Sequence, residues 1–235
     1  MADITSPIIV ALDHRSPQEA LKFAQQLDPT QCRLKIGTAL FTRIGPPIIE
    51  KLRKMKFEVF LDLKFHDIPN TVGIACEAAM DLGVWMMNIH AQGGSRMMAI
   101  AREYIDKKTG PKPLLIGVTI LTSLDANDLK EIGLIPEPAA TVQRLAVLAQ
   151  KAGLDGVVCS PQELKLLRST LKPNFKLVTP GIHFGDIEAN DQKRVATPAQ
   201  AIRDGADYLV IGRSLTQSTQ PLVVLEKILN EIPQS

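Results

Sequence analysis

The sequence predicts an α/β protein whose eight strand–helix units close into a (β/α)8 barrel, the TIM-barrel fold class, as one domain over residues 1–235. Short apolar runs alternate with amphipathic segments eight times along the chain. The apolar runs are continuous, which is typical of parallel strands buried on both faces. The length of 235 residues is close to the roughly 250 that such a barrel needs. An open, doubly wound sheet of eight strands is the structural alternative.

Four units are predicted in the first half of the chain. Strands are expected at residues 8–13, at residues 33–37, from residue 59 through the charged residues before Pro69, and at residues 84–90. Helices are expected at residues 16–27, 44–55, 70–83 and 94–106. Ser16, followed by Pro17 and Glu19, is typical of a helix start, and Asn70 is the predicted cap of the third helix.

Four further units are predicted in the second half. Strands are expected at residues 114–121, 156–160, 175–179 and 208–213. Helices are expected near residue 128, at residues 139–152, after the capping sequences that begin at Ser160 and Thr197, and at residues 221–232. A long loop is expected at residues 182–196.

Composition excludes several classes of function. The net charge is only +2 and aromatic residues make up 4%, so we expect no nucleic-acid partner. No apolar run approaches the 18 or so residues of a membrane span, and no basic segment precedes an apolar stretch at the N-terminus. Cys32, Cys76 and Cys159 are widely spaced in apolar contexts, as expected for reduced core residues. We therefore expect a cytoplasmic protein without a membrane partner.

Charged residues interrupt the third strand where burial is otherwise expected. Asp62 and Lys64 are two residues apart, so their side chains leave an extended chain on the same face. Buried charges are costly unless they are paired, so a structural ion pair and a working site are both open interpretations. The other strand ends favour a site, because most of them also carry a polar group or a glycine: Asp13, Lys35, His90, Thr122, Ser123, Ser160, Gly181 and Arg213. Each of these residues also has a simpler structural interpretation. Ser160 is more simply a helix cap, and Thr122 and Ser123 are consistent with the start of a turn. His90 is equally consistent with a hydrogen-bonded packing residue.

The loops after strands seven and eight have the composition of a phosphate site. In such barrels these loops commonly bind phosphate through backbone N–H groups. Here they contain Gly181, Gln192, Gly212 and Arg213; glycine permits close approach of the backbone, and arginine offers a forked donor. There is no dinucleotide fingerprint, Walker loop or zinc motif. We therefore expect neither a cofactor nor a metal.

The segment Asp-Leu-Lys-Phe-His-Asp-Ile-Pro-Asn-Thr at residues 62–71 closely resembles the signature of the orotidine 5′-phosphate decarboxylase family. Shorter segments resemble that family in the same order along the chain, at residues 11–13, 34–37, 88–91, 121–123, 153–160, 178–182, 190–192 and 211–214. The resemblance implies a homodimer that converts orotidine 5′-phosphate (OMP) to UMP and CO2 without metal or cofactor. It also implies that each active site is shared between the two subunits.

The resemblance further implies a role for individual residues. Lys35, Asp62 and Lys64 would form a charged array completed by Asp67 from the partner, with Lys64 as the proton donor. The remaining residues would contact other parts of the substrate. Asp13 and Lys35 would hold the ribose, Ser123 and its neighbouring backbone would read the pyrimidine, Thr122 would line the cavity, and Thr71 would come from across the interface. Ile68 and Pro180 would shape the pocket for CO2, and Gln192, Gly212 and Arg213 would bind the phosphate.

One position departs from the family pattern, and two rival functions stay open. Bacterial relatives usually have arginine where this chain has His183, which puts a phosphate contact from that position in doubt. Magnesium-dependent sugar-phosphate decarboxylases and synthases resemble the chain in their Asp-x-Lys-x-x-Asp segment, but they would need a carboxylate near Lys35. A non-catalytic nucleotide-sensing barrel would need the phosphate site and not the charged array.

Overall fold

The strands close into a parallel barrel in which each is paired with its sequence neighbours and the first is paired with the eighth. The computed structural model describes residues 4–14, 16–184 and 195–233. The strands are β1 (Ile8–Ala11), β2 (Arg33–Gly37), β3 (Val59–Phe65), β4 (Met86–His90), β5 (Leu114–Val118), β6 (Gly156–Val158), β7 (Lys176–Thr179) and β8 (Tyr208–Ile211). The predicted barrel is therefore confirmed, and the open sheet is excluded.

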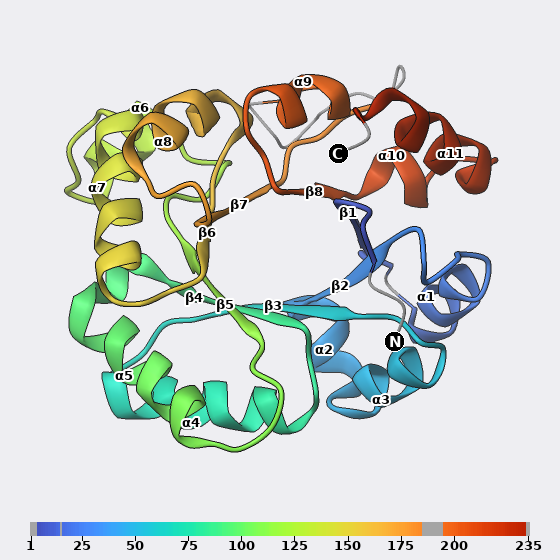
Figure 1. Ribbon diagram of the computed structural model, residues 1–235, viewed down its shortest axis with the longest axis horizontal. Coiled ribbons are helices and arrows are strands. Elements are labelled where there is room, and N and C mark those ends of the chain that lie inside the picture. Colours follow the sequence, from blue (N-terminus) through green and yellow to red (C-terminus); the bar gives the residue numbers. More distant parts are fainter. Residues whose placement is uncertain (1–3, 15, 185–194, 234–235) are drawn as a thin grey trace.

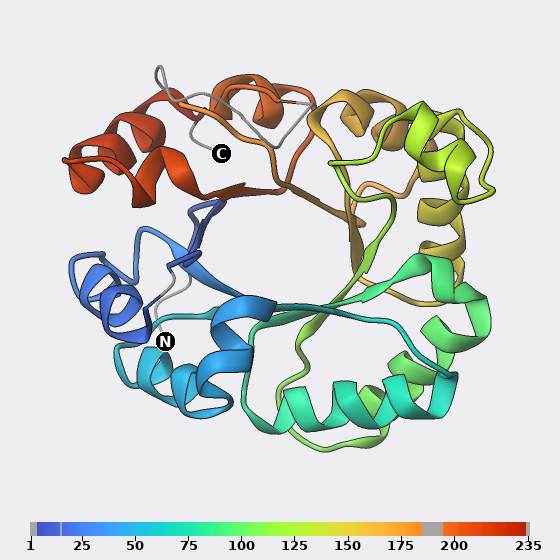
Figure 2. The same cartoon turned by 180° about the vertical axis from the view of Figure 1, so that it is seen from behind.

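Helices surround the barrel on all sides, as Figures 1 and 2 show from its two ends. They are α1 (Pro17–Ala24), α2 (Thr38–Ile44), α3 (Pro47–Lys54), α4 (Pro69–Asp81), α5 (Gly94–Lys107), α6 (Ala126–Glu131), α7 (Pro138–Lys151), α8 (Leu164–Thr170), α9 (Pro198–Arg203), α10 (Arg213–Thr216) and α11 (Pro221–Glu231). Two short 3-10 helices, η1 (Ala91–Gly93) and η2 (Pro161–Glu163), precede α5 and α8. Each of these helices lies outside the strands.

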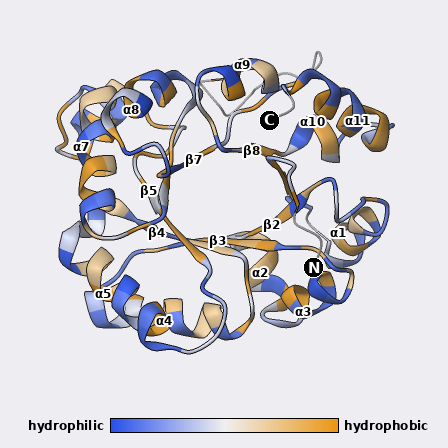
Figure 3. Ribbon diagram, in the orientation of Figure 1, coloured by the Kyte–Doolittle hydropathy of each residue, from blue (hydrophilic) through white to orange (hydrophobic). Residues whose placement is uncertain are grey.

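Side chains alternate along each strand between two separate cores. One set points outward and packs against the helices, as Ile8 and Val10 do on β1. The other set points into the barrel and includes Ile9, Phe60 and Met86. Both faces of a strand are thus buried, which explains the unbroken apolar runs in the sequence and the apolar strands of Figure 3. The interior is filled, so a ligand can enter only at an end of the barrel.

Several strands are two or three residues shorter than predicted, such as β1, which ends at Ala11, and β5, which ends at Val118. Three other differences affect the helices. Helix α2 follows β2 directly and was not predicted. Strand β8 ends at Ile211, and Arg213 begins the short helix α10 instead of ending the strand. Asn70 is not a cap: the N-cap of α4 is Ile68, and the Asn70 side chain accepts a hydrogen bond from the Tyr104 hydroxyl at 2.6 Å. The predicted caps Ser16, Ser160 and Thr197 are confirmed.

The three cysteines are buried and unpaired, as predicted. Burial raises the pKa of the Cys32 and Cys76 thiols to about 12, so both stay protonated at neutral pH. In the described ranges no helix combines the length and the apolar character needed to cross a bilayer.

A stacked arginine closes the end of the barrel where the strands begin. The Arg33 guanidinium lies 4.3 Å from the centroid of the Trp85 ring and 5.4 Å from that of Tyr208. Its Nε donates to Glu58 at 2.7 Å, and its two terminal nitrogens donate to the carbonyls of Ser6 and Ile4. This single side chain therefore ties the segment before β1 to the base of the barrel.

Replacing Arg33 with methionine should lower the free energy of unfolding by about 2 kcal/mol, because two backbone carbonyls and Glu58 lose their donor together with the ring contacts. Urea unfolding followed by circular dichroism measures this change. Glu58→Gln is the matched control, which should cost less because the Glu58 side chain is partly exposed. Equal losses in the two variants would contradict the proposed anchoring role of Arg33.

Candidate active site

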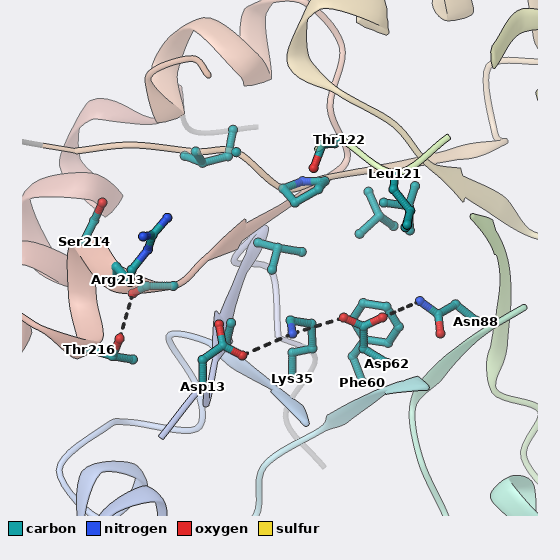
Figure 4. A pocket seen from close by; sticks show the side chains of 18 of the residues that line it. Asp13, Lys35, Phe60, Asp62, Asn88, Leu121, Thr122, Arg213, Ser214 and Thr216 are labelled. Carbon is teal, nitrogen blue, oxygen red and sulfur yellow. Dashed lines mark hydrogen bonds and ion pairs between the residues drawn. The ribbon is translucent and has the colours of Figure 1, made fainter. Parts of the chain in front are cut away.

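A cavity of about 670 Å³ opens at the C-terminal ends of the strands. This is the end at which barrels of this class carry their sites, and the volume suits a nucleotide-sized ligand. Figure 4 shows Asp13, Lys35, Asp62 and Asn88 in a row on one side, with Arg213 beyond the Asp13 end of that row. The cavity therefore has a charged floor and a cationic group at one end.

The charged floor is a chain of contacts between neighbouring strands. The Lys35 ammonium lies 3.1 Å from Asp62 Oδ2 and 3.6 Å from an Asp13 oxygen. The Lys64 ammonium lies 2.7 Å from Asp62 Oδ1, and the Asn88 side-chain amide donates to the same oxygen at 2.7 Å. Lys35 and Asp62 are only 9% and 7% exposed. Both Asp62 oxygens are thus held by the protein.

These contacts determine the protonation states. Burial alone would raise the pKa of Asp62, but the charges of Lys35 and Lys64 and the hydrogen bonds from Lys64 and Asn88 lower it to about 2. Burial alone would lower the pKa of Lys35, but the charges and hydrogen bonds of Asp62 and Asp13 raise it. Asp62 is therefore ionised and Lys35 protonated at neutral pH. The pKa of Asp62 in the folded protein lies below its usual value of 3.8. The contacts of the Asp62 carboxylate therefore stabilise the fold above about pH 3.8, and this stabilisation is lost as the pH falls toward 2.

Lys64 has an unusual backbone conformation. Its φ of 53° lies in the left-handed region, which is costly for a residue with a side chain. The pairing of β3 with β4 also shifts register between Leu61 and Phe65, as at a β-bulge. The Lys64 N–H donates to the Asn88 side-chain oxygen at 2.8 Å. The ion pair between Asp62 and Lys64 is thus formed across an irregular strand end, where strain is characteristic of a working site.

The opposite side of the cavity is built from the turns after β7 and β8. Gly181, Gly212 and Arg213 line it, together with His183. A Cβ atom at Gly212 would lie 3.4 Å from an Asp13 oxygen, so the turn after β8 passes close to the Asp13 end of the charged row. The Phe184 N–H donates to the Ser214 hydroxyl at 3.3 Å and joins the two turns.

The cavity brings together eight of the residues predicted for substrate or catalysis: Asp13, Lys35, Asp62, Lys64, Thr122, Pro180, Gly212 and Arg213. Four others lie outside the set that lines it: Asp67, Ile68, Thr71 and Ser123 are all exposed. Gln192 falls outside the described residues. The charged array of one chain is therefore complete except for Asp67.

Sequence reasoning missed several residues that line the cavity. Asn88, Phe60, Ser214 and Thr216 all contribute to its wall. Asn88 is the most informative of these, because it is 1% exposed and contacts both Asp62 and Lys64. The sequence signal that could have identified Asn88 is a polar amide side chain within the otherwise apolar segment that forms β4.

Two polar strand ends, Ser160 and His90, do not line the cavity. Ser160 forms a capping box with Glu163 at the start of η2, as its simpler interpretation predicted. His90 lies beside His66, with ring centroids 5.2 Å apart. Burial and the neighbouring His66 and Lys64 lower the pKa of His90, so it is neutral at pH 7.

The donor set around the cavity does not resemble a metal site. Among the described residues, no group of three or more His, Cys, Asp and Glu side chains is placed to hold a metal ion. Asp62 directs its two oxygens at lysine and asparagine donors, and Lys35 places an ammonium where a second carboxylate would be needed.

Comparison with known proteins agrees with this geometry. Residues 6–228 match the model of the "Orotidine 5'-phosphate decarboxylase / HUMPS family". An orotidine 5′-phosphate decarboxylase of Vibrio cholerae is 56% identical over 221 residues, which cover 94% of this chain and 96% of that protein. One from Pseudomonas fluorescens is 53% identical over 232 residues and covers 99% of both.

Solved structures show the same fold. The crystal structure of orotidine 5′-phosphate decarboxylase from Lactobacillus acidophilus has a TM-score of 0.87 and 35% identity, covering 97% of this chain and 100% of that one. An uncharacterized conserved protein from Geobacillus kaustophilus has a TM-score of 0.85 and 39% identity, with the same coverage. The chain therefore belongs to the orotidine 5′-phosphate decarboxylase/HUMPS family.

Proposed function

We propose that this protein decarboxylates orotidine 5′-phosphate to UMP and CO2 without metal or cofactor, as the last step of de novo pyrimidine synthesis. The observation that carries the proposal is the buried Lys35–Asp62–Lys64 array in the floor of a cavity that has Arg213 at one end. Relatives more than 50% identical over nearly the whole chain are named for this activity.

The array suits the electronic demand of this reaction. Breaking the bond between C6 and the carboxylate leaves an electron pair on C6 in the plane of the pyrimidine ring, where the π system cannot delocalise it. A fixed ammonium in a site of low dielectric stabilises that charge far better than water does. Lys64 supplies the ammonium. When the bond between C6 and the carboxylate breaks, CO2 leaves, and Lys64 transfers a proton to C6, where the electron pair becomes a C–H bond and Lys64 is left as a neutral amine.

Asp62 and Lys35 set the position and charge of Lys64. Asp62 is ionised and accepts from the Lys64 ammonium at 2.7 Å, which holds that ammonium in one place. Lys35 neutralises the other Asp62 oxygen at 3.1 Å. An ionised Asp62 beside the substrate carboxylate also raises the energy of the bound ground state, and the departure of CO2 relieves this repulsion.

The remaining contacts bind the parts of the substrate that do not react. Asp13 and Lys35 hold the ribose hydroxyls, Thr122 lines the cavity, and Ser123 with its neighbouring backbone reads the edge of the pyrimidine. Pro180 borders the space that CO2 enters. Gly212, Arg213 and Gln192 bind the phosphate, and the position of His183 in the cavity lining supports a contribution from its imidazole. Binding energy gained at the phosphate stabilises the closed site around C6.

We further propose a homodimer in which Asp67, Ile68 and Thr71 enter the partner's site. Asp67 follows Lys64 by three residues and yet does not line the cavity of its own chain. Ile68, the N-cap of α4, is 68% exposed and Ile74 on α4 is 51% exposed, so exposed apolar side chains follow Asp67 in this segment. The protein would be cytoplasmic, and residues 1–235 would form a single domain.

Purified protein should consume OMP in an ultraviolet absorbance assay with no metal added, and EDTA should not change the rate. Loss of activity in EDTA would favour a magnesium-dependent sugar-phosphate enzyme. Binding of UMP without turnover of OMP would favour a nucleotide-sensing barrel. Either result would contradict the proposed function.

Arg213→Ala should raise KM and lower kcat/KM by about 100-fold or more, because the charge-assisted contact with the phosphate is lost. Steady-state kinetics with OMP measure both constants. Arg203→Ala is the matched control, since Arg203 is on α9 and its terminal nitrogen donates to Gln200 at 3.0 Å. If Arg213→Ala left both constants unchanged, the phosphate assignment would be wrong.

A further inference from the structure

Asn88 is a neutral residue at the end of the charged row. It lies on β4, is 1% exposed, and is the neighbour of Asp62 in Figure 4. Its side-chain nitrogen donates to Asp62 Oδ1 at 2.7 Å, and its side-chain oxygen accepts from the Lys64 backbone N–H at 2.8 Å. One amide therefore connects two residues of the array by two separate hydrogen bonds.

The chemistry of the two partners requires an amide in this orientation. An ionised carboxylate needs a donor, and a backbone N–H needs an acceptor. Asparagine supplies both within one rigid planar group. Aspartate would supply only acceptors when ionised, and leucine would supply neither. The contact also falls where β3 leaves its regular pairing with β4, so it supports the left-handed backbone of Lys64.

We propose that Asn88 is a positioning residue for decarboxylation. It aligns the Asp62 carboxylate with the Lys64 backbone, so that the Lys64 ammonium is directed at C6. The inference rests on the proposed function. It predicts that Asn88 affects the rate of the chemical step much more than the binding of nucleotide, because the phosphate and ribose contacts lie elsewhere in the cavity.

Asn88→Ala and Asn88→Asp test this role. Both should lower kcat on OMP by about 100-fold while KM and the dissociation constant for UMP change within about threefold. Asn88→Asp keeps the shape and the acceptor for the Lys64 N–H, but it places a second carboxyl beside Asp62. These two groups should titrate as a coupled pair, so the acidic limb of its pH–kcat profile should move to higher pH than in the unmodified protein.

Thr119→Val is the matched control for the loss of a buried hydrogen bond. Thr119 is also 1% exposed, and its hydroxyl donates to the Val158 carbonyl at 2.8 Å, a hydrogen bond that involves neither Asp62 nor Lys64. The melting temperature of Thr119→Val should fall by an amount similar to that of Asn88→Ala. Its kcat and its pH–kcat profile should be those of the unmodified protein.

Two outcomes would overturn the proposal. One is a kcat within about threefold of the unmodified protein in the Asn88 variants. The other is a parallel loss of kcat and UMP binding without a shift in the pH profile, which indicates a merely structural role. If Asn88→Asp does not fold, the split between kcat and UMP affinity in Asn88→Ala decides alone. The unmodified protein distinguishes failure of the Asn88 proposal from failure of the proposed function. If the proposed function is wrong, the unmodified protein will not consume OMP at all.

Discussion

Lys64→Ala should lower kcat for OMP by more than about 10⁴-fold, because in the proposed mechanism the substitution removes both the ammonium beside C6 and the proton that C6 receives. The fold should persist, since the Lys64 side chain is 34% exposed and the buried pair of Lys35 and Asp62 remains. An ultraviolet assay with high enzyme concentration measures the residual rate. Calorimetry with UMP should show that nucleotide still binds.

Lys176→Ala is the control for the loss of a lysine that faces an aspartate on the same barrel. Lys176 begins β7 at the opposite end from the cavity, and its ammonium lies 3.3 Å from Asp207. Its kcat should equal that of the unmodified protein. Near-normal turnover by Lys64→Ala would refute the proton-donor role. An equal loss of kcat in the two variants would mean that the lost activity reflects damage to the fold and not the loss of a proton donor.

The barrel was predictable because its constraints are local and repeated. A strand that is buried on both faces must be apolar throughout, and eight such runs separated by helices leave few arrangements. Helix α10 was missed because Arg213 continues the polar strand-end pattern without any capping signal. Asn70 was misassigned as a cap because its partner, Tyr104, is distant in sequence.

The charged array was predictable for a similar reason. Asp13 and Asp62 each follow an apolar run, Lys35 lies near the end of a short predicted strand, and parallel strands place their ends at one rim. The role of Asn88 was not predictable, because an isolated amide within a strand does not reveal which donor and acceptor it will meet. The bulge that sets the backbone of Lys64 depends on the pairing of β3 with β4 and is likewise invisible in the sequence.

Mixed dimers provide a decisive test of whether Asp67 acts in the partner's site. Lys64→Ala and Asp67→Ala should each be nearly inactive when they are purified alone. A heterodimer of the two, isolated with two different affinity tags, should regain about half of the activity of the unmodified dimer. One of its sites would combine the intact Lys64 of one chain with the intact Asp67 of the other, and the second site would lack both.

The opposite assignment makes a different prediction for the same heterodimer. If Asp67 served the site of its own chain, one site would lack Lys64 and the other would lack Asp67, so the heterodimer would stay inactive. The structure supports the shared arrangement, since Asp67 is exposed and one of its carboxylate oxygens accepts from the Ile68 N–H at 2.6 Å, outside the cavity of its own chain. A heterodimer of two unmodified chains with the same tags gives the reference rate. Recovered activity would therefore show that residues 62–71 contribute to two sites at once, with Asp62 and Lys64 in one and Asp67 in the other.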